Sequence, residues 1–262
     1  MFSIRLIGPG RAGRSLAAAL ADAGCDVRGV LGRGDDLAGA AAGVDALVLA
    51  VPDGALAEVA AAVTPVPETV VLHLSGAAGL EVLAPHPRRA SLHPLVPLPT
   101  AEIGRVRLRA GTTFAVAGDP LAGRLAAVLG GRVLHVDEDA RAAYHAAACI
   151  AANHVVALLG QVERVAAAAG LPPDAFRGLT RAAVEDVELL GPARALTGPA
   201  ARGDDTTIDR HRRSLAEVAP EELDGYDAGV VLARRLAAAA GTAAGTGTAA
   251  PGVRRQEVAP CA

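Results

Sequence analysis

The sequence contains no lysine and no tryptophan, and aromatic residues make up 2% of its 262 residues. Every strongly basic side chain is therefore an arginine, which excludes a lysine Schiff base and a lysine general acid. The three cysteines, Cys25, Cys149 and Cys261, are scattered and odd in number, which suits a reducing compartment. The net charge of −3, without a basic block, argues against nucleic acid as a partner.

The sequence also gives no sign of a leader or a membrane span. The N-terminus runs directly into an apolar strand pattern, so we expect no secretory signal peptide. The apolar runs are too short, or too interrupted by charge, for a transmembrane helix, and we expect no membrane association. A cytoplasmic protein is the resulting expectation.

A glycine-rich turn lies between a predicted strand at residues 2–7 and a predicted helix at residues 14–20. Gly8 would permit a tight turn, Gly10 would let a pyrophosphate approach the backbone, and Gly13 would let the helix pack closely on the strand. The N-terminus of the helix would bind the anion. This is a dinucleotide-binding pattern. The alternative is a glycine turn in a Rossmann-like fold that binds nothing. The predicted cofactor loop consists of Gly8, Pro9, Gly10, Arg11, Ala12 and Gly13.

Arg33 stands at the tip of the second predicted strand, residues 25–31. An acidic residue at this point binds the ribose of NAD, whereas an arginine accommodates the 2′-phosphate of NADP. Asp35 and Asp36 come slightly late, so Arg33 favours NADP(H). The alternative is that Arg33 is an ordinary solvated loop charge.

The first half of the chain alternates strands and helices, which predicts a mainly parallel, doubly wound sheet. Val51 and Pro52, at the end of the third strand, are expected to contact the same cofactor. The further strands are predicted at 44–51, 69–74, 90–93, 113–117 and 133–136, with helices at 54–63 and 120–129.

The second half is predicted to be helical throughout. One pattern about thirty residues long runs from 139 to 169 and stops at Gly170 and the prolines that follow it. Three more helices follow at about 174–190, 204–218 and 221–240. We therefore predict a Rossmann NADP-binding domain at 1–137, a helical substrate and dimerisation domain at 138–240, and a disordered tail at 241–262.

Three polar residues follow predicted strands, where ligands bind in Rossmann folds. They are Asp53, Ser75 and His93. Ser75 would lie beside the nicotinamide, and Pro94 fixes an extended backbone at His93. His73 is more simply explained as a buried histidine with one backbone partner.

The long helix carries a stripe formed by His145, Cys149 and Asn153, with Tyr144 beside it. His145 and Asn153 would lie about 12 Å apart along the helix axis, so at most one reaches the reacting centre. An asparagine in a buried alanine-rich stripe needs a hydrogen bond, which makes Asn153 the preferred candidate. His145 and Cys149 lack further ligands, so we predict no metal site.

A polar loop at residues 196–207 precedes a predicted helix. Asp204 or Asp205 would cap that helix, and Arg202 would bind a carboxylate. The alternative is a plain connector with an ordinary cap. The predicted substrate-binding residues are Thr197, Gly198, Arg202 and Asp204.

Five segments together resemble the Rossmann-like/DUF2520 family of predicted NADP-dependent oxidoreductases. They are the glycine loop, residues 72–77, residues 91–95, the Tyr144-His145…Asn153 helix and residues 196–204. The resemblance implies a Rossmann domain followed by a helical dimerisation domain like the C-terminal domain of 6-phosphogluconate dehydrogenase, an architecture similar to pyrroline-5-carboxylate reductase and the β-hydroxyacid dehydrogenases. The lysine of the latter enzymes, four residues before their asparagine, is Cys149 here, so that acid cannot be carried over.

We therefore expect a homodimeric, NADPH-dependent reductase of a small carboxylate-bearing carbonyl compound. Asn153 would orient the carbonyl, His93 or His145 would supply the proton, with Ser75 beside them, and Arg202 would bind the carboxylate. Ketopantoate is the first candidate substrate, which the resemblance suggests. The alternatives are an imine reductase of the pyrroline-5-carboxylate type and a non-catalytic NADP-binding sensor or scaffold.

Overall fold

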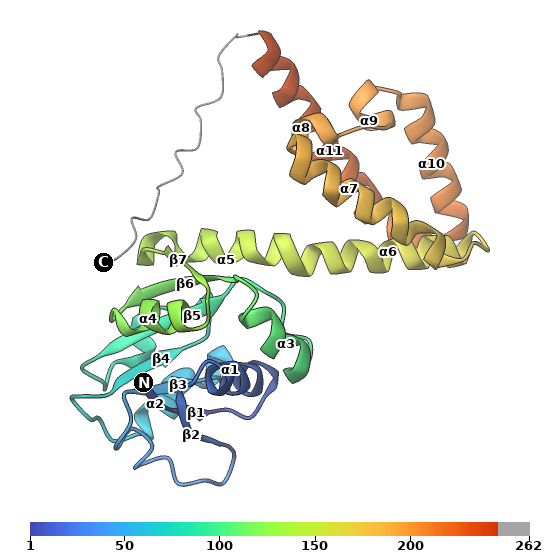
Figure 1. The fold of residues 1–262 in the computed structure, drawn as a ribbon. Helices are drawn as coiled ribbons and strands as arrows, with labels where there is room; N and C mark the ends of the chain where they lie inside the picture. The colour runs from blue at the N-terminus through green and yellow to red at the C-terminus, as the bar shows by residue number, and fades with distance from the viewer. Residues whose placement is uncertain (246–262) are drawn as a thin grey trace. The chain divides into compact units, whose positions relative to one another are not determined.

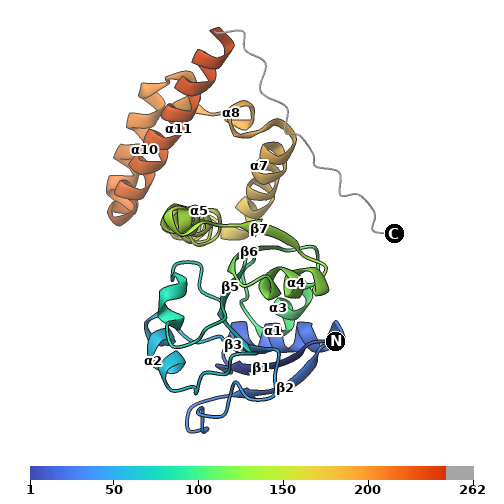
Figure 2. The same ribbon diagram turned by 90° about the vertical axis from the view of Figure 1, so that its left-hand side faces the viewer.

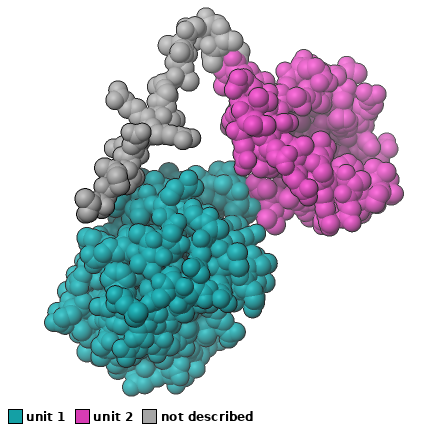
Figure 3. Space-filling model, in the orientation of Figure 1, with its two compact units in different colours: residues 1–154 teal, residues 155–262 magenta. Residues whose placement is uncertain are grey.

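The computed structural model describes residues 1–245, which fall into two compact units that divide between His154 and Val155 (Figure 3). The sequence places the division at 137/138, before the long helix, whereas the units divide within that helix. The final helix, predicted to end at residue 240, continues to Gly245. Residues 246–262 of the predicted tail lie outside the described residues.

A seven-stranded sheet forms the centre of the first unit, with the strand order β2-β1-β3-β4-β5-β6-β7. Neighbouring strands are parallel except for β5 and β6, which are antiparallel. All seven predicted strands are present, and the predicted α/β class is confirmed. The strands are β1 (Ser3–Ile7), β2 (Asp26–Leu31), β3 (Ala46–Leu49), β4 (Val70–His73), β5 (Arg89–Pro94), β6 (Thr113–Gly118) and β7 (Arg132–His135).

Helices cover both faces of this sheet (Figures 1 and 2). One of them, α3, is absent from the sequence prediction, because its short segment carries an internal glycine and two arginines and shows no clear apolar stripe. Thr100 caps it by accepting a hydrogen bond from the Ile103 N–H at 3.2 Å. The helices of the first unit are α1 (Arg11–Asp22), α2 (Leu56–Ala61), α3 (Ala101–Leu108), α4 (Leu121–Val128) and α5 (Arg141–Cys149).

Alternate residues of each strand pack into two separate cores. Val48 of β3 faces the core formed with α1, α3 and α4, whereas its neighbours Leu47 and Leu49 face the core formed with α2. The strand period of two places successive side chains on opposite faces, and both faces of a parallel sheet are covered. This arrangement explains why β3 reads as a continuous apolar run.

The long predicted helix is present, with one irregularity. The α-helix α5 passes into a π-helical segment, Ile150–His154, and continues in the second unit as α6 (Val155–Ala168). Taken together, Glu138–Ala168 is long and apolar enough to cross a membrane by length and composition alone. The expectation that the apolar runs are too short, or too interrupted by charge, is therefore wrong for this segment. Core helices of soluble proteins meet the same two criteria, so the finding is weak evidence for a membrane span.

The second unit is helical, as predicted. Its small buried core includes Ala166, Ile208 and Leu215. Glu222, nearly buried, pairs with Arg164 of α6, and its carbonyl accepts a hydrogen bond from the Gln161 amide at 2.9 Å. The remaining helices are α7 (Arg177–Leu190), α8 (Pro192–Ala195), α9 (Pro199–Arg202), α10 (Asp205–Val218) and α11 (Leu223–Gly245).

Candidate functional site

The surroundings of the three glycines in the predicted cofactor loop differ from one position to the next. Gly8 has φ +110°, and a Cβ there would lie 2.3 Å from the Ala50 carbonyl oxygen at the end of β3. A Cβ at Gly13 would lie 2.0 Å from the carbonyl oxygen of Gly8. At Gly10, by contrast, a Cβ would meet no heavy atom within 4 Å. Gly8 and Gly13 are thus required by the packing of the fold, whereas Gly10 leaves free space at the surface of the loop.

The N-terminus of α1 offers backbone N–H groups to a ligand. Its N-cap is Gly10, which has no side chain to accept a hydrogen bond from the first turn, and that turn carries no acidic residue. Arg11 and Arg14 are exposed there, and Ala12 is half-buried. Unpaired N–H groups together with the helix dipole favour an anion. The residues present therefore fit the pyrophosphate of a dinucleotide.

The end of β2 lies beside this loop. A Cβ at Gly32 would lie 3.2 Å from Cγ of Pro9, and the Asp35 carboxylate accepts a hydrogen bond from the Gly32 N–H at 2.7 Å. Arg33, between them, is exposed. At the other side of the loop, Cγ1 of Val51 would lie 3.2 Å from a Cβ at Gly8, and Pro52 follows it at the surface. The structure thus places Gly32, which precedes Arg33, and Val51 against the glycine loop, while the role of these residues in cofactor binding stays a prediction.

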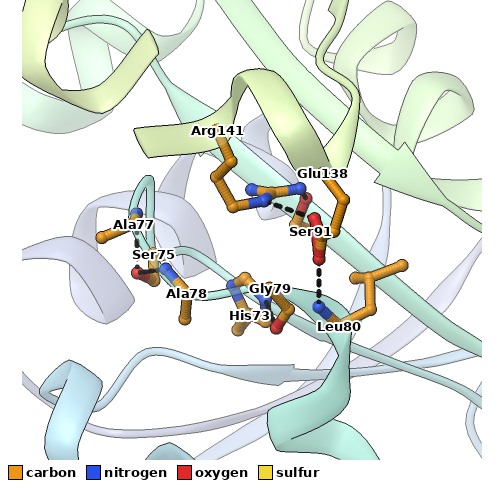
Figure 4. A network of polar contacts seen from close by, with 9 residues as sticks. All are labelled: His73, Ser75, Ala77, Ala78, Gly79, Leu80, Ser91, Glu138 and Arg141. Carbon is orange, nitrogen blue, oxygen red and sulfur yellow. Dashed lines mark hydrogen bonds and ion pairs between the residues drawn. The ribbon is translucent and has the colours of Figure 1, made fainter. Parts of the chain in front are cut away.

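Ser75 organises the loop that follows β4 (Figure 4). Its hydroxyl oxygen accepts hydrogen bonds from the N–H groups of Ala77 at 3.1 Å and Ala78 at 2.9 Å. His73, at the end of the strand, contacts the Gly79 carbonyl through Nε2 at 3.2 Å, and its Nδ1 is buried without a partner in the described structure. The interpretation of His73 as a buried histidine with one backbone partner agrees with this geometry. Ser75 therefore has a defined structural role in this loop. Its place beside the nicotinamide stays a prediction.

A buried arginine, which no sequence pattern indicated, ties α5 to the sheet. Arg141 is 4% exposed; its Nε donates to the Glu138 carboxylate at 2.8 Å, and its NH2 group donates to Oγ of Ser91 at 3.3 Å (Figure 4). Glu138 also accepts a hydrogen bond from the Leu80 N–H at 2.9 Å. The hydrogen bond from Arg141 holds the pKa of the Glu138 carboxyl below its usual value. The network joins β5, the loop after β4 and the start of α5.

His93 and the helix α5 meet above the end of the sheet. Nδ1 of His93 lies 2.5 Å from the hydroxyl oxygen of Tyr144, and the ring of His145 lies 6.0 Å from that of His93, centroid to centroid. Gly76 fits between the two imidazoles, because a Cβ there would lie 2.7 Å from Cδ2 of His145 and 2.8 Å from Cε1 of His93. The structure therefore assembles His93, His145 and Tyr144 at the carboxyl ends of β4 and β5.

The environment of this cluster sets its protonation. Burial, together with the neighbouring His145, lowers the pKa of His93 from 6.5 to about 4. Burial raises the pKa of Tyr144 to about 12, and the positive charge of Arg141 acts in the opposite direction. At neutral pH His93 is an uncharged imidazole and Tyr144 is a protonated phenol.

Asn153 does not satisfy the reasoning that selected it. Its side chain is exposed, not buried, and it lies in the π-helical segment Ile150–His154. The extra residue in a π turn shifts the helical phase, so the four-residue stripe ends at Cys149, whose sulfur lies 3.8 Å from Nε2 of His145. Asn153 stays a prediction that rests on resemblance alone. Within residues 1–245, three or more potential metal-ligating side chains do not gather anywhere.

The predicted substrate-binding residues lie in the second unit. Asp204 caps α10, as one of the two predicted alternatives, by accepting a hydrogen bond from the Thr207 N–H at 3.0 Å. That contact lowers the pKa of the Asp204 carboxyl. Arg202, at the end of α9, and Thr197 are exposed, and Gly198 is half-buried with φ +93°. An ordinary cap thus accounts for Asp204, while the role of Arg202 stays a prediction.

Two family models match the chain. Residues 33–99 match the Rossmann-like domain, and residues 112–232 match DUF2520, a domain of unknown function. The chain therefore contains a Rossmann-like domain and a DUF2520 domain in this order, which confirms the resemblance. No curated protein matches the sequence significantly.

Solved structures share the fold at low sequence identity. A candidate NADP oxidoreductase from Bacteroides fragilis is 22% identical, with a TM-score of 0.75 over 89% of this chain and 98% of that one. Protein TM1727 from Thermotoga maritima is 21% identical, with a TM-score of 0.68 over 90% and 98%. Pyrroline carboxylate reductase from Plasmodium falciparum, solved with NADP bound, is 12% identical, with a TM-score of 0.59 over 90% and 98%. At these identities the likeness establishes the two-part fold.

Proposed function

We propose that this protein is an NADPH-dependent reductase of a small carbonyl compound that bears a carboxylate. The observation that carries the proposal is the glycine loop. Gly8 and Gly13 are fixed by contacts within the protein, while the open space at Gly10 faces an uncapped helix N-terminus. A loop that merely turned the chain would have no need of a glycine at position 10. The fold is shared with a reductase solved with NADP bound.

Different residues around the loop would bind different parts of the cofactor. The first turn of α1 would hold the pyrophosphate, and Arg33 would pair with the adenosine 2′-phosphate. Asp35 is already engaged by the Gly32 N–H, which disfavours its use as the ribose acceptor of an NAD site. When bound, NADPH supplies a hydride. The side chains of the protein would orient the substrate and supply the proton.

The carboxyl ends of β4 and β5 are the proposed reacting centre. Gly76 lets the imidazoles of His93 and His145 pack directly against the loop after β4, because a Cβ there would lie 2.8 Å and 2.7 Å from them. Reduction places negative charge on the carbonyl oxygen, which needs a donor. His93 or His145 is the donor that the sequence suggests, with Asn153 orienting the carbonyl. We retain Arg202, with Thr197, Gly198 and Asp204, as the proposed carboxylate-binding set.

Ketopantoate is the first proposed substrate, since it offers a ketone for the hydride and a carboxylate for Arg202. Pyrroline-5-carboxylate, an imine with a carboxylate, is the second. A reductive aminase from Aspergillus terreus, solved in complex with NADPH4, cyclohexanone and allyl amine, shares the fold at a TM-score of 0.61 and 17% identity, which favours keeping the imine. A sensor without turnover would bind NADPH and reduce neither. We propose the cytoplasm as the compartment and a homodimer as the assembly.

The test is an NADPH-oxidation assay with both compounds, run on the parent protein and on Asn153→Ala and Arg202→Ala. Asn153→Ala should mainly lower kcat, and Arg202→Ala should mainly raise KM. Tight NADPH binding without reduction of 2-oxo acids or cyclic imines would favour the sensor. Turnover equal to the parent in both variants would place the substrate site elsewhere.

A further inference from the structure

The proposed reduction needs a general acid that protonates the carbonyl oxygen. The described structure limits which side chains at the carboxyl ends of β4 and β5 can be this acid. The sequence has no lysine. His73 is fully buried and faces the Gly79 carbonyl, and the oxygen of Ser75 already accepts two backbone hydrogen bonds. His93, with a pKa of about 4, carries no imidazolium proton at neutral pH. The polar side chains of this cluster that remain are His145 and Tyr144.

Tyr144 meets the requirement. It is partly exposed, and its hydroxyl oxygen lies 2.5 Å from Nδ1 of His93, with the two rings edge to face at 5.7 Å between centroids. His93 itself ends β5 beside Gly76, so the phenol stands at the edge of the sheet where ligands bind in this fold. Its proton is retained across the physiological pH range.

We propose that Tyr144 is the acid of this site and donates the proton to the carbonyl oxygen, while His93 holds the phenol oxygen in place. The inference rests on the proposed reductase function. As the carbonyl carbon gains a hydride, the π electron pair moves to its oxygen. The Oη–H bond of Tyr144 breaks and the proton joins that oxygen, leaving a phenolate. A proton from solvent water then restores the phenol.

The surroundings of Tyr144 support the phenolate that this step creates. In the tautomer with hydrogen on Nδ1, His93 donates a hydrogen bond to the phenol oxygen, and the O–H of Tyr144 is free to point at a ligand. The buried guanidinium of Arg141 lies one helical turn before Tyr144, and its charge lowers the pKa of the phenol against the effect of burial. Arg141 also donates to Ser91, two residues before His93. Two parallel contacts therefore fix α5 against β5.

Tyr144→Phe removes the hydroxyl alone, and the chain supplies a matched control. Tyr226 of the second unit contacts His211 at 2.8 Å with nearly the same ring geometry, 5.9 Å between centroids. Tyr144→Phe should lower kcat about 10²- to 10⁴-fold, with KM and the NADPH dissociation constant within about twofold of the parent. Tyr226→Phe should keep the parent kcat. An active parent together with an equally active Tyr144→Phe would overturn the assignment and leave the reductase function standing.

The pH profile separates a phenol from an imidazolium. With Tyr144 as the acid, kcat should stay level from about pH 6 to pH 9, because the phenol is protonated throughout. A histidinium acid would instead make kcat fall about tenfold per pH unit above its pKa. That fall in the parent would overturn the proposal.

The contact between His93 and Tyr144 can be tested without an activity assay. In a proton NMR titration, the His93 midpoint in Tyr144→Phe should differ from the parent by at least about half a pH unit, and Tyr226→Phe should leave it in place. An identical His93 midpoint in Tyr144→Phe would show that the two groups do not meet, and would overturn the proposal. A parent that reduces none of the compounds would instead refute the reductase function, from which the role of Tyr144 follows.

Discussion

The carboxylate of Asp35 accepts a hydrogen bond from the N–H of Gly32 at 2.7 Å, and this contact closes a turn at the end of β2. Arg33, inside this turn, is exposed. Because an arginine at this position pairs with a 2′-phosphate, the turn geometry favours NADPH over NADH.

Arg33→Ala should therefore weaken NADPH binding about tenfold or more and leave NADH binding nearly unchanged, since only NADPH carries the 2′-phosphate. Calorimetric titration with both cofactors measures this. Arg28→Ala, on β2 and paired with Asp26, is the control. Equal affinities of the parent for NADPH and NADH would contradict the role of Arg33.

Gly10 and Gly13 should respond differently to the same substitution. Gly13→Ala brings a Cβ to within 2.0 Å of the Gly8 carbonyl oxygen, so α1 must move away from β1 and the unfolding temperature should fall by several degrees. Gly10→Ala meets no protein atom, so the fold should persist while NADPH affinity drops. Thermal unfolding and cofactor titration separate the two effects. Undiminished NADPH binding by Gly10→Ala would argue against a pyrophosphate at this loop.

The stability of the protein should decrease on acidification between about pH 6.5 and pH 4. The pKa of His93 is about 4 in the folded protein and near 6.5 when unfolded, so the unfolded state binds more protons in this window. The free energy of unfolding therefore rises with pH through the window, by at most about 3 kcal/mol from this residue.

Urea unfolding at several pH values measures this slope, which His93→Gln should reduce. It should not vanish, because burial lowers the pKa of His73 and His86 as well. His154→Gln, at an exposed position, is the control. An unchanged slope in His93→Gln would contradict the burial of His93 in solution.

Glu138→Ala should destabilise the first unit by about 1–3 kcal/mol, because it leaves the buried guanidinium of Arg141 without its carboxylate. The half-exposed position of Glu138 keeps the cost below that of a fully buried pair. Glu81→Ala removes an exposed carboxylate nearby and should cost much less. Urea unfolding of both variants is the measurement, and equal stabilities would refute the role given to the pair.

The second unit should form a homodimer. It exposes large apolar side chains that a monomer would leave in water, among them Val156 at 69%, Leu179 at 71% and Leu189 at 78%. Light scattering at micromolar concentrations should give twice the mass of the chain, and Leu179→Glu or Leu189→Glu should shift the mass toward the monomer. A monomeric parent mass would rule the dimer out.

The alternation of strands and helices can be predicted from the amino-acid sequence alone, because hydrophobic periodicity and glycine or proline stops are local properties. The cofactor loop can be predicted in the same way, since the three glycines lie within six residues of one another. The helix α3, with its cap Thr100, was not predicted from the sequence, because it depends on that cap and on packing and has no strong periodic pattern.

The composition of the site depends on contacts between segments that are distant in the sequence. His93 and Tyr144 are separated by 51 residues in the chain, and the antiparallel return of β6 stands between them, so no local pattern reports their contact. Arg141 is buried because Ser91 and Glu138 receive its hydrogen bonds, whereas its sequence neighbourhood resembles any exposed helix start. The π turn moved Asn153 out of the stripe that a regular helix would have kept. Periodicity fixes which face a residue takes within its own element, but the pairing of faces depends on contacts between distant segments.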